Sequence, residues 1–451
     1  MPDTILTGET TELLQTLIRN ACVNDGSPES GEEIRSADTL QQFLEGAGLD
    51  VARFESIPGR ASVVARIEGT DPDAPSLCLM GHTDVVPVSP DGWREDPFGG
   101  EVIRNAEGDD EVWGRGAIDM LNLTSSMAVA FRHLARSGFR PKGDLIYFGV
   151  ADEEAGGTWG AEWMFEHHPE AIDADYCVTE LGGWSLVDDH GTRHVTVNVG
   201  EKGLAWRRLT VRGTPGHGSM PFGADNALVT AAEIVRRLAE HRPAPHIDEV
   251  WEAQVATLPL SDELRDALRD PDRIDETLAG LPVPVARACH ALTHTTISPN
   301  VAHGGQKTNV IPDVVHIEVD IRTVPGVDRD DVDAMLRDAL GDLADRVETT
   351  SLQEGVATQS PTDNELWESI ARQTQVAYPG AQIVPGMVVG GTDARFYRDR
   401  GRVAYGAGLF TPGMDMATFG SRFHGHDERI DVGSLALATE FWMNLATDLL
   451  S

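Results

Sequence analysis

Carboxylates and a histidine follow two apolar, strand-like segments of the 451-residue chain. The stretch "MGHTDVVP" places His82 and Asp84 two residues apart, so both side chains point the same way if the backbone is extended. The apolar run 145–150 ends in three successive acids at 152–154. Because like charges repel at this spacing, their proximity indicates a nearby cation. These residues therefore predict metal-dependent chemistry.

The paired acids Glu153 and Glu154 suggest two different roles. Neighbouring residues at a strand end face opposite ways, so one carboxylate can bind metal while the other stays free as a base. The alternative for these two glutamates is a solvated acidic turn. The alternative for His82 and Asp84 is a turn after the strand that binds no metal. Neither cluster settles the question alone.

Three further candidates lie farther along the chain. Asp119 in "GRGAIDM" directly precedes a predicted helix at 122–134, where it could be an N-cap or could bridge two ions. Glu180 closes the apolar run "YCVTEL", and "FHGHDE" contains His424 and His426. A lone histidine of this kind is usually a surface residue. The clusters taken together, in this order, predict a metal site.

Alternating helical and strand-like segments predict how these residues are positioned. Apolar strand-like runs in the first half alternate with amphipathic segments, which is typical of an α/β layer with a mostly parallel sheet. In such sheets, sites gather at the carboxyl ends of strands. Helical patterns are expected at 10–21, 34–47, 121–136, 225–240, 328–341, 363–377 and 431–449.

The pattern changes near residue 200 and returns near residue 353. The intervening part contains half-exposed, alternating strands, which predicts an α+β domain at 201–352 inserted into an α/β catalytic domain formed by 1–200 and 353–451. Within it, the proline-bearing, acidic stretch 243–290 is interpreted as an insertion.

Composition excludes several classes of partner. With 36 basic and 73 acidic residues the net charge is −37, which disfavours nucleic acid and anionic membranes. No apolar stretch approaches the roughly 18 residues of a membrane span, and the N-terminus has no secretory pattern, so a cytoplasmic location is expected. The cysteines are too scattered to predict a disulfide framework or a cysteine zinc site; they are Cys22, Cys78, Cys177 and Cys289.

The combined motifs resemble those of the dinuclear zinc metallopeptidases and deacylases, which include acetylornithine deacetylase, succinyl-diaminopimelate desuccinylase, aminoacylase and glutamate carboxypeptidase. The resemblance extends from "GHTDVVP" through "GRGAIDM", "DEE" and "TELGG" to "FHGHDE", and includes "GTPGHGSMP", "TNVIPD", "DIRTVPG" and "GGTDAR". It implies a mixed, mostly parallel sheet flanked by helices, an inserted ferredoxin-like lid and dimerisation domain, two zinc ions (or cobalt or manganese) and a homodimer. The stretch 243–290 departs in length from compact members, so the shape of the lid and substrate pocket stays open.

The same resemblance implies roles for individual residues. His82 and Glu180 would bind opposite ions, Asp119 would bridge them, and Glu154 and His424 would complete the ligands. In that pattern Glu153 is the general base and Asp84 orients His82.

Candidate substrate contacts come mainly from the inserted domain. His217 would donate a hydrogen bond to the developing oxyanion from the partner subunit of a dimer, or it is a surface turn residue. Asn309 and Arg322 resemble a substrate-contacting pair, in which Arg322 clamps a carboxylate or forms a structural ion pair. The backbone of Gly391 and Thr392 would be exposed to substrate.

These expectations define a hydrolase. The sequence predicts zinc-dependent cleavage of an amide bond in a small, carboxylate-bearing substrate such as an N-acyl amino acid or a short peptide. Glutamate rather than aspartate at Glu180 favours deacylases and carboxypeptidases within the family. A metal-dependent dipeptidase is the alternative enzyme. A non-catalytic binding protein would lack a ligand or the base, and none is missing.

Overall fold

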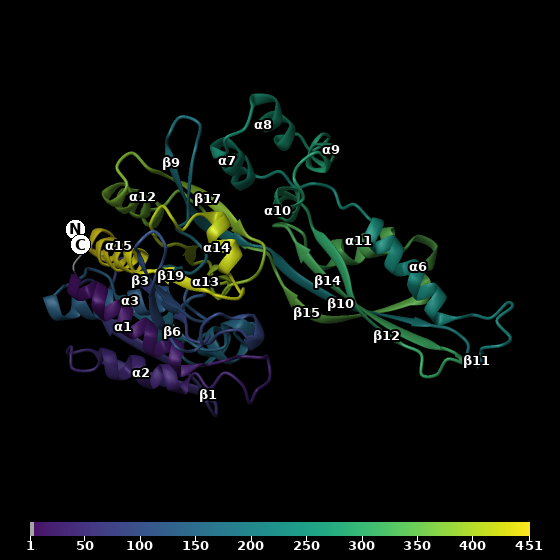
Figure 1. Cartoon of the computed structure of the whole chain (residues 1–451), viewed down its shortest axis with the longest axis horizontal. Coiled ribbons are helices and arrows are strands. Elements are labelled where there is room, and N and C mark those ends of the chain that lie inside the picture. Colours follow the sequence, from purple (N-terminus) through teal and green to yellow (C-terminus); the bar gives the residue numbers. More distant parts are fainter. Residues whose placement is uncertain (1–3) are drawn as a thin grey trace.

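A ten-stranded mixed sheet forms the larger part of the molecule in the computed structural model, which describes residues 4–451 (Figure 1). The main strand order is β1-β2-β6-β3-β7-β18-β9-β16, with β8 and β17 also paired to β9. The central strands β6, β3, β7 and β18 are parallel, which confirms the mixed sheet expected from the sequence. The strands are β1 (Asp50–Ile57), β2 (Arg60–Ile67), β3 (Leu77–His82), β6 (Leu145–Val150), β7 (Tyr176–Thr179), β8 (Ser185–Val187), β9 (Arg193–Glu201), β16 (Thr358–Gln359), β17 (Gln382–Val388) and β18 (Val403–Gly406).

Helices cover both faces of this sheet, so its central strands are buried on both sides. Every residue of β3 and β6 is buried, which explains their continuous apolar sequences. One core contains Leu14, Phe131 and Trp442, and a second core on the sheet contains Met164 and Tyr397. The covering helices are α1 (Thr4–Asn20), α2 (Ile34–Leu44), α3 (Leu121–Ser137), α12 (Glu365–Ala377) and α15 (Val432–Leu450) for the first core, and α4 (Trp163–His167), α5 (Pro169–Ile172) and α13 (Ala394–Arg398) for the second.

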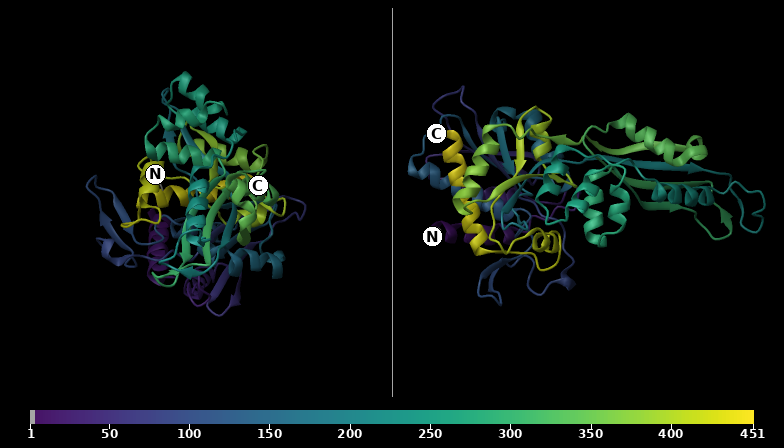
Figure 2. Two further views of the ribbon diagram at one scale, coloured as in Figure 1. Left: turned by 90° about the vertical axis from the view of Figure 1, so that its right-hand side faces the viewer. Right: turned by 90° about the horizontal axis from the view of Figure 1, so that it is seen from above.

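A second, four-stranded antiparallel sheet extends away from the large sheet (Figures 1 and 2). Its order is β12-β14-β10-β15, and β14 alternates between buried and half-buried residues because helices cover one face. Leu209, Ile234, Ile317 and Leu336 belong to its core. The elements are β10 (Gly203–Arg212), β12 (Thr296–Gly304), β14 (Val314–Thr323), β15 (Val347–Gly355), α6 (Ala227–Glu240) and α11 (Arg329–Leu340), with a small pair, β11 (Gly216–His217) and β13 (Val310–Ile311). The proposed domain boundaries stay a prediction.

The stretch interpreted as an insertion forms four helices with a core of their own. This core contains Trp251, Val255 and Leu268, and the Trp251 indole donates to the Leu268 carbonyl at 2.8 Å. The first helix packs against β17 of the large sheet. Lys202, between β9 and β10, donates to two carbonyls at the end of the fourth helix. The helices are α7 (Glu249–Thr257), α8 (Asp262–Arg269), α9 (Ile274–Ala279) and α10 (Val283–Thr293).

The loops near the parallel strand ends are held by a three-stranded sheet. Its order is β19-β5-β4, so residues near the C-terminus pair with a hairpin that precedes α3. Its strands are β4 (Glu101–Arg104), β5 (Asp110–Trp113) and β19 (Arg429–Asp431), and the short helix α14 (Met416–Arg422) precedes β19. Across residues 4–451, none of the helices combines the length and apolarity needed to cross a membrane.

Candidate metal centre

The carboxyl ends of three neighbouring strands bring the acidic candidates together. β3 ends at His82, β6 is followed by Glu153 and Glu154, and β7 is followed by Glu180. Because β3 is parallel to both β6 and β7, the three carboxyl ends meet at the same edge of the sheet. The structure thus places together residues separated by up to about 100 positions in sequence.

Asp119 lies between two imidazoles. Its Oδ1 is 3.2 Å from Nε2 of His82, and its Oδ2 is 2.7 Å from Nε2 of His424. The N-cap of α3 is Met120 and no side chain caps this helix, so the N-cap interpretation of Asp119 is wrong. A carboxylate with one oxygen on each side is arranged to bridge two cations.

The glutamates divide across this bridge. Glu180 Oε2 is 3.6 Å from His82 Nε2, whereas Glu154 Oε2 is 3.5 Å from His424 Nε2. His82 and Glu180 therefore lie on the same side of Asp119, which does not support the expectation that they bind opposite ions. Because β3 lies between β6 and β7, the order of the strands alone does not determine this pairing.

These side chains fit a divalent cation. Potential ligand atoms lie within 4.8 Å of one another in two groups of three, His82 with Asp119 and Glu154, and His82 with Glu153 and Glu180. Within residues 4–451, the buried Oε1 of Glu154 has no hydrogen-bond partner. Burial, and next the charge of Asp119, raise the pKa of Glu154 to about 7 and that of Glu180 to about 8. A cation would compensate this crowding, and imidazole and carboxylate ligands suit zinc, cobalt or manganese.

Glu153 and Asp84 lie close to the same centre. Glu153 lines the adjoining cavity, and one of its oxygens lies within 4.8 Å of ligand atoms of His82 and Glu180. The Nδ1 atom of His82 is 3.0 Å from the Asp84 carbonyl oxygen and 3.5 Å from its carboxylate. Asp84 thus faces one ring nitrogen while the other faces Asp119, which fixes the orientation of the imidazole.

A buried ion pair that the sequence analysis did not identify anchors the bridge. Arg115 Nη1 is 2.6 Å from Glu428 Oε2, and their side chains are 3% and 0% exposed. Glu428 Oε1 accepts hydrogen bonds from the backbone N–H groups of Ile118 at 2.8 Å and Asp119 at 3.2 Å. Arg115 also donates to the carbonyl of His424 at 3.3 Å. The Arg115–Glu428 pair thus joins the loop that carries Asp119 to the loop that carries His424. Arg115 lies in the motif "GRGAIDM" and Glu428 in the motif "FHGHDE".

A second buried network supports the acidic turn after β6. Arg60 Nη1 lies 2.5 Å from Glu33 and 3.3 Å from Asp152. The amide of Asn24 donates to Asp84 at 2.8 Å and to Asp152 at 3.2 Å. Asp152 therefore contributes to support of the turn. The arginine that begins the apolar strand "RASVVARI" is a local signal of this network.

The candidates in the inserted domain separate into two locations. His217 and Asn309 are exposed at the β11–β13 tip, which Figure 1 shows at the far end of the small sheet, and Gly218 donates to the Asn309 carbonyl at 2.8 Å. Arg322 instead lines the cavity at the metal centre and pairs with Asp320 at 2.8 Å. Asn309 and Arg322 of one chain therefore do not meet.

Gly391 and Thr392 also differ from each other. Gly391 lines the cavity, and its contact with substrate stays a prediction. Thr392 is 2% exposed, and both its N–H and its hydroxyl donate to Glu201, at 3.0 and 2.7 Å. The expectation of exposed backbone at Thr392 is wrong because a buried glutamate 191 residues away occupies its donors.

The cavity beside the acidic centre has a volume of 750 Å³. Glu153, Glu154 and His424 line it, and so does Arg322, which is carried by β14 of the small sheet. This volume is within the range of small-molecule sites.

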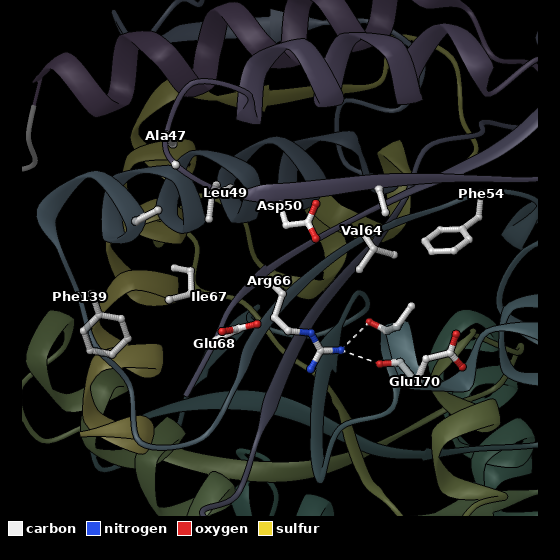
Figure 3. A pocket seen from close by; sticks show the side chains of 14 residues that line it. Ala47, Leu49, Asp50, Phe54, Val64, Arg66, Ile67, Glu68, Phe139 and Glu170 are labelled. Carbon is white, nitrogen blue, oxygen red and sulfur yellow. Dashed lines mark hydrogen bonds between the residues drawn. The ribbon is translucent and has the colours of Figure 1, made fainter. Parts of the chain in front are cut away.

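A different cavity, of 500 Å³, opens along β1 and β2 (Figure 3). Arg66 on its wall donates to the carbonyls of Glu170 and Ala171 at 2.8 and 3.0 Å and pairs with Asp144, so its guanidinium is already engaged. The candidate metal groups in residues 4–451 all lie at the first cavity.

Known proteins resemble this chain over most of its length. The model of "Peptidase family M20/M25/M40" matches residues 78–448. The chain is 27% identical to N-fatty-acyl-amino acid synthase/hydrolase PM20D1 of Xenopus tropicalis, over 86% of this chain and 75% of the relative. It is 28% identical to aminoacylase-1 of Sus scrofa, over 91% and 89% of the two chains. The M20 family metallo-carboxypeptidase Sso-CP2 from Sulfolobus solfataricus has the same fold, with a TM-score of 0.71, 18% identity and coverage of 98% and 99%.

Proposed function

The chain belongs to peptidase family M20/M25/M40 and is a metal-dependent hydrolase, and we propose that it cleaves the amide bond of N-acyl amino acids or short peptides with a free carboxylate. The family match confirms the resemblance stated from the motifs. Relatives named as an aminoacylase and as an N-fatty-acyl-amino acid synthase/hydrolase support an acylated amino acid as the substrate. The arrangement of Asp119 between two imidazoles is the observation that carries the proposal.

Two divalent ions fit the ligand set. His82, Asp119 and Glu180 would hold one ion, and His424, Asp119 and Glu154 would hold the other. When bound, such ions act as Lewis acids towards an amide carbonyl and lower the pKa of water towards about 7. Zinc is the proposed metal, with cobalt or manganese as substitutes at the same ligands.

The protein's own groups position the substrate and move the proton. Glu153 at the cavity wall accepts the proton of the attacking water and delivers it to the leaving amine. Arg322 faces the same cavity and binds the substrate carboxylate. The β11–β13 tip that carries His217 lies at the end of the small sheet far from β3 and β6 (Figure 1). In the proposed homodimer a second copy would therefore donate this hydrogen bond to the oxyanion.

The variant Glu153→Ala tests the role of the base. We expect kcat to fall by about 10²–10⁴-fold on a panel of N-acyl amino acids and dipeptides, while elemental analysis still finds two metal ions per chain. Glu348→Ala, an exposed glutamate of the small sheet, is the control and should keep full activity. Activity that survives in Glu153→Ala would exclude this glutamate as the base. A metal-loaded wild type that cleaves neither class of amide would refute the proposed function.

A further inference from the structure

A row of aromatic rings leads away from the candidate metal centre along one wall of the cavity. The ring of Phe423 stacks on His424 with centroids 4.2 Å apart. Phe419 follows at 5.4 Å from Phe423, and Trp184 at 4.9 Å from Phe419. All four residues line the cavity. Stacked and tilted rings at these separations form a continuous apolar surface that begins at a proposed metal ligand.

Other residues of the cavity wall are also apolar. Ala288, Ala291 and Leu292 of α10 line it, together with Met387 and Val389 at and after the end of β17. The small side chains of Ala288 and Ala291 leave space in front of the helix. The inserted helices therefore supply a wall of this cavity, and the hydrogen bonds from Lys202 to the carbonyls of Ala291 and His294 hold that wall in place.

Large apolar side chains remain exposed around this cavity. Met416, at the start of α14, is 61% exposed and Val389 is 47% exposed, and both line the cavity. Water contacts this surface unless an apolar group covers it. Two arginines line the cavity in addition to the acidic residues. Arg395 donates to the carbonyls of Thr392 at 3.1 Å and Gly156 at 2.6 Å, so its guanidinium is engaged by the backbone. Arg322 is carried by the small sheet, whereas the ring row belongs to the part of the fold that carries His424.

We propose that this cavity binds a large, neutral, apolar acyl group, aromatic or alkyl, against the row Trp184–Phe419–Phe423. The inference rests on the proposed function and narrows it to N-acyl amino acids with bulky apolar acyl groups. Arg322 binds the amino-acid carboxylate, the scissile amide lies at the metal centre, and the acyl group extends over the rings. Acetyl and charged acyl groups are poor substrates, because they leave the apolar wall in contact with water.

A chain-length series tests the inference on the metal-loaded enzyme. With N-acetyl-, N-hexanoyl- and N-decanoylglycine, kcat/KM should rise about threefold to fourfold for each methylene that becomes buried. In a second series the acyl group stays acetyl and the amino acid changes from glycine to leucine and phenylalanine. If only the second series shows a gain, the apolar surface binds the amino-acid side chain and the inference is overturned.

Substitutions locate the effect on the ring row. Phe419→Ala should lower kcat/KM for N-decanoylglycine at least tenfold more than it lowers kcat/KM for N-acetylglycine. Phe139→Ala, a phenylalanine of the other cavity in Figure 3, is the matched control and should not change the ratio. Ala288→Trp, on α10 in the cavity wall, should lower kcat/KM for N-decanoylglycine much more than kcat/KM for N-acetylglycine. Equal effects on both substrates would refute the inference.

Two further measurements separate failure of the inference from other failures. Thermal melting and metal analysis show whether each variant is folded and loaded, and Phe419→Leu replaces Phe419→Ala if the latter does not fold. Calorimetric titration of Glu153→Ala should show at least tenfold tighter binding of N-decanoylglycine than of N-acetylglycine. Cleavage of short amides without any preference for acyl-chain length would refute the inference but not the proposed function. If no amide is cleaved, the proposed function is refuted, whatever the binding result.

Discussion

The buried pair Arg115–Glu428 gives a quantitative prediction about how the bridging loop is held. Glu428 accepts hydrogen bonds from the Arg115 guanidinium at 2.6 Å and from backbone N–H groups at 2.8 and 3.2 Å. Glu428→Gln keeps the shape, but it removes the counter-charge of a buried guanidinium and brings an amide NH₂ into a site of three donors. Loss of one partner of a buried pair costs about 3–5 kcal/mol.

The assay is urea unfolding of metal-free protein, followed by circular dichroism. We expect Glu428→Gln to lower the free energy of unfolding by about 3–5 kcal/mol. The control is Glu348→Gln, whose 3.3 Å pair with Arg212 is exposed, with side chains 66% and 69% accessible, and which should change stability by less than about 1 kcal/mol. Arg115→Met combined with Glu428→Gln should recover part of the loss, because the charge without a partner is gone.

Metal affinity gives an independent measurement of the same pair. Because Glu428 orients the backbone of Asp119 and Arg115 contacts the His424 carbonyl, Glu428→Gln should weaken metal binding about 10–100-fold in a competition titration with a chelator. If Glu428→Gln resembles Glu348→Gln in both unfolding and metal affinity, the pair does not position the bridge, and the reasoning is refuted.

Three other predictions concern the metal, a buried lysine and the core. Chelation of the bound ions should abolish activity and lower Tm, and added zinc should restore both; a Tm independent of metal would argue against binding at this buried cluster. Burial lowers the pKa of Lys202 to about 7, so the unfolded chain binds more protons between pH 7 and pH 10. The free energy of unfolding of the wild type should therefore rise from pH 7 to pH 9 relative to Lys202→Met, and a constant difference would contradict this. Trp442→Ala, at a side chain that is 0% exposed, should lower the free energy of unfolding by about 3–5 kcal/mol in urea titrations, and a loss below 1 kcal/mol would contradict its place in the core.

The strand-end candidates could be predicted because their signal is local. His82 and Glu180 each close an apolar run, and Glu153 follows another, so parallel pairing alone brings them to one edge. The helices could be predicted for a similar reason, since amphipathic periodicity is visible within one segment, as in α6.

The pairing of ligands could not be predicted in the same way. Which glutamate faces which imidazole depends on how the loops after β6 and β7 and the loop that carries His424 fold together, and no single segment of the sequence shows this. The resemblance implies that His82 and Glu180 bind opposite ions, whereas the structure places Nε2 of His82 3.6 Å from Oε2 of Glu180.

The burial of several charged side chains also could not be predicted from the sequence. Arg60, Arg115 and Glu428 look like ordinary polar residues, and their burial becomes plausible only when a partner distant in sequence is known. The donors of Thr392 are similarly occupied by Glu201, from another strand of the fold. The sequence could identify 243–290 as unusual, but the contact of α7 with β17 depends on tertiary packing.

The position of Asp119 makes the two halves of the centre thermodynamically dependent on each other. The Asp119 carboxylate has one oxygen directed to each imidazole. A metal ion bound in one half would therefore change the charge and the mobility of the same carboxylate that the other half needs as a ligand. Reciprocity demands that the two binding events influence each other by the same free energy in either order of addition. The loading curve should therefore be cooperative, of positive or negative sign, and no pair of independent affinities should describe it.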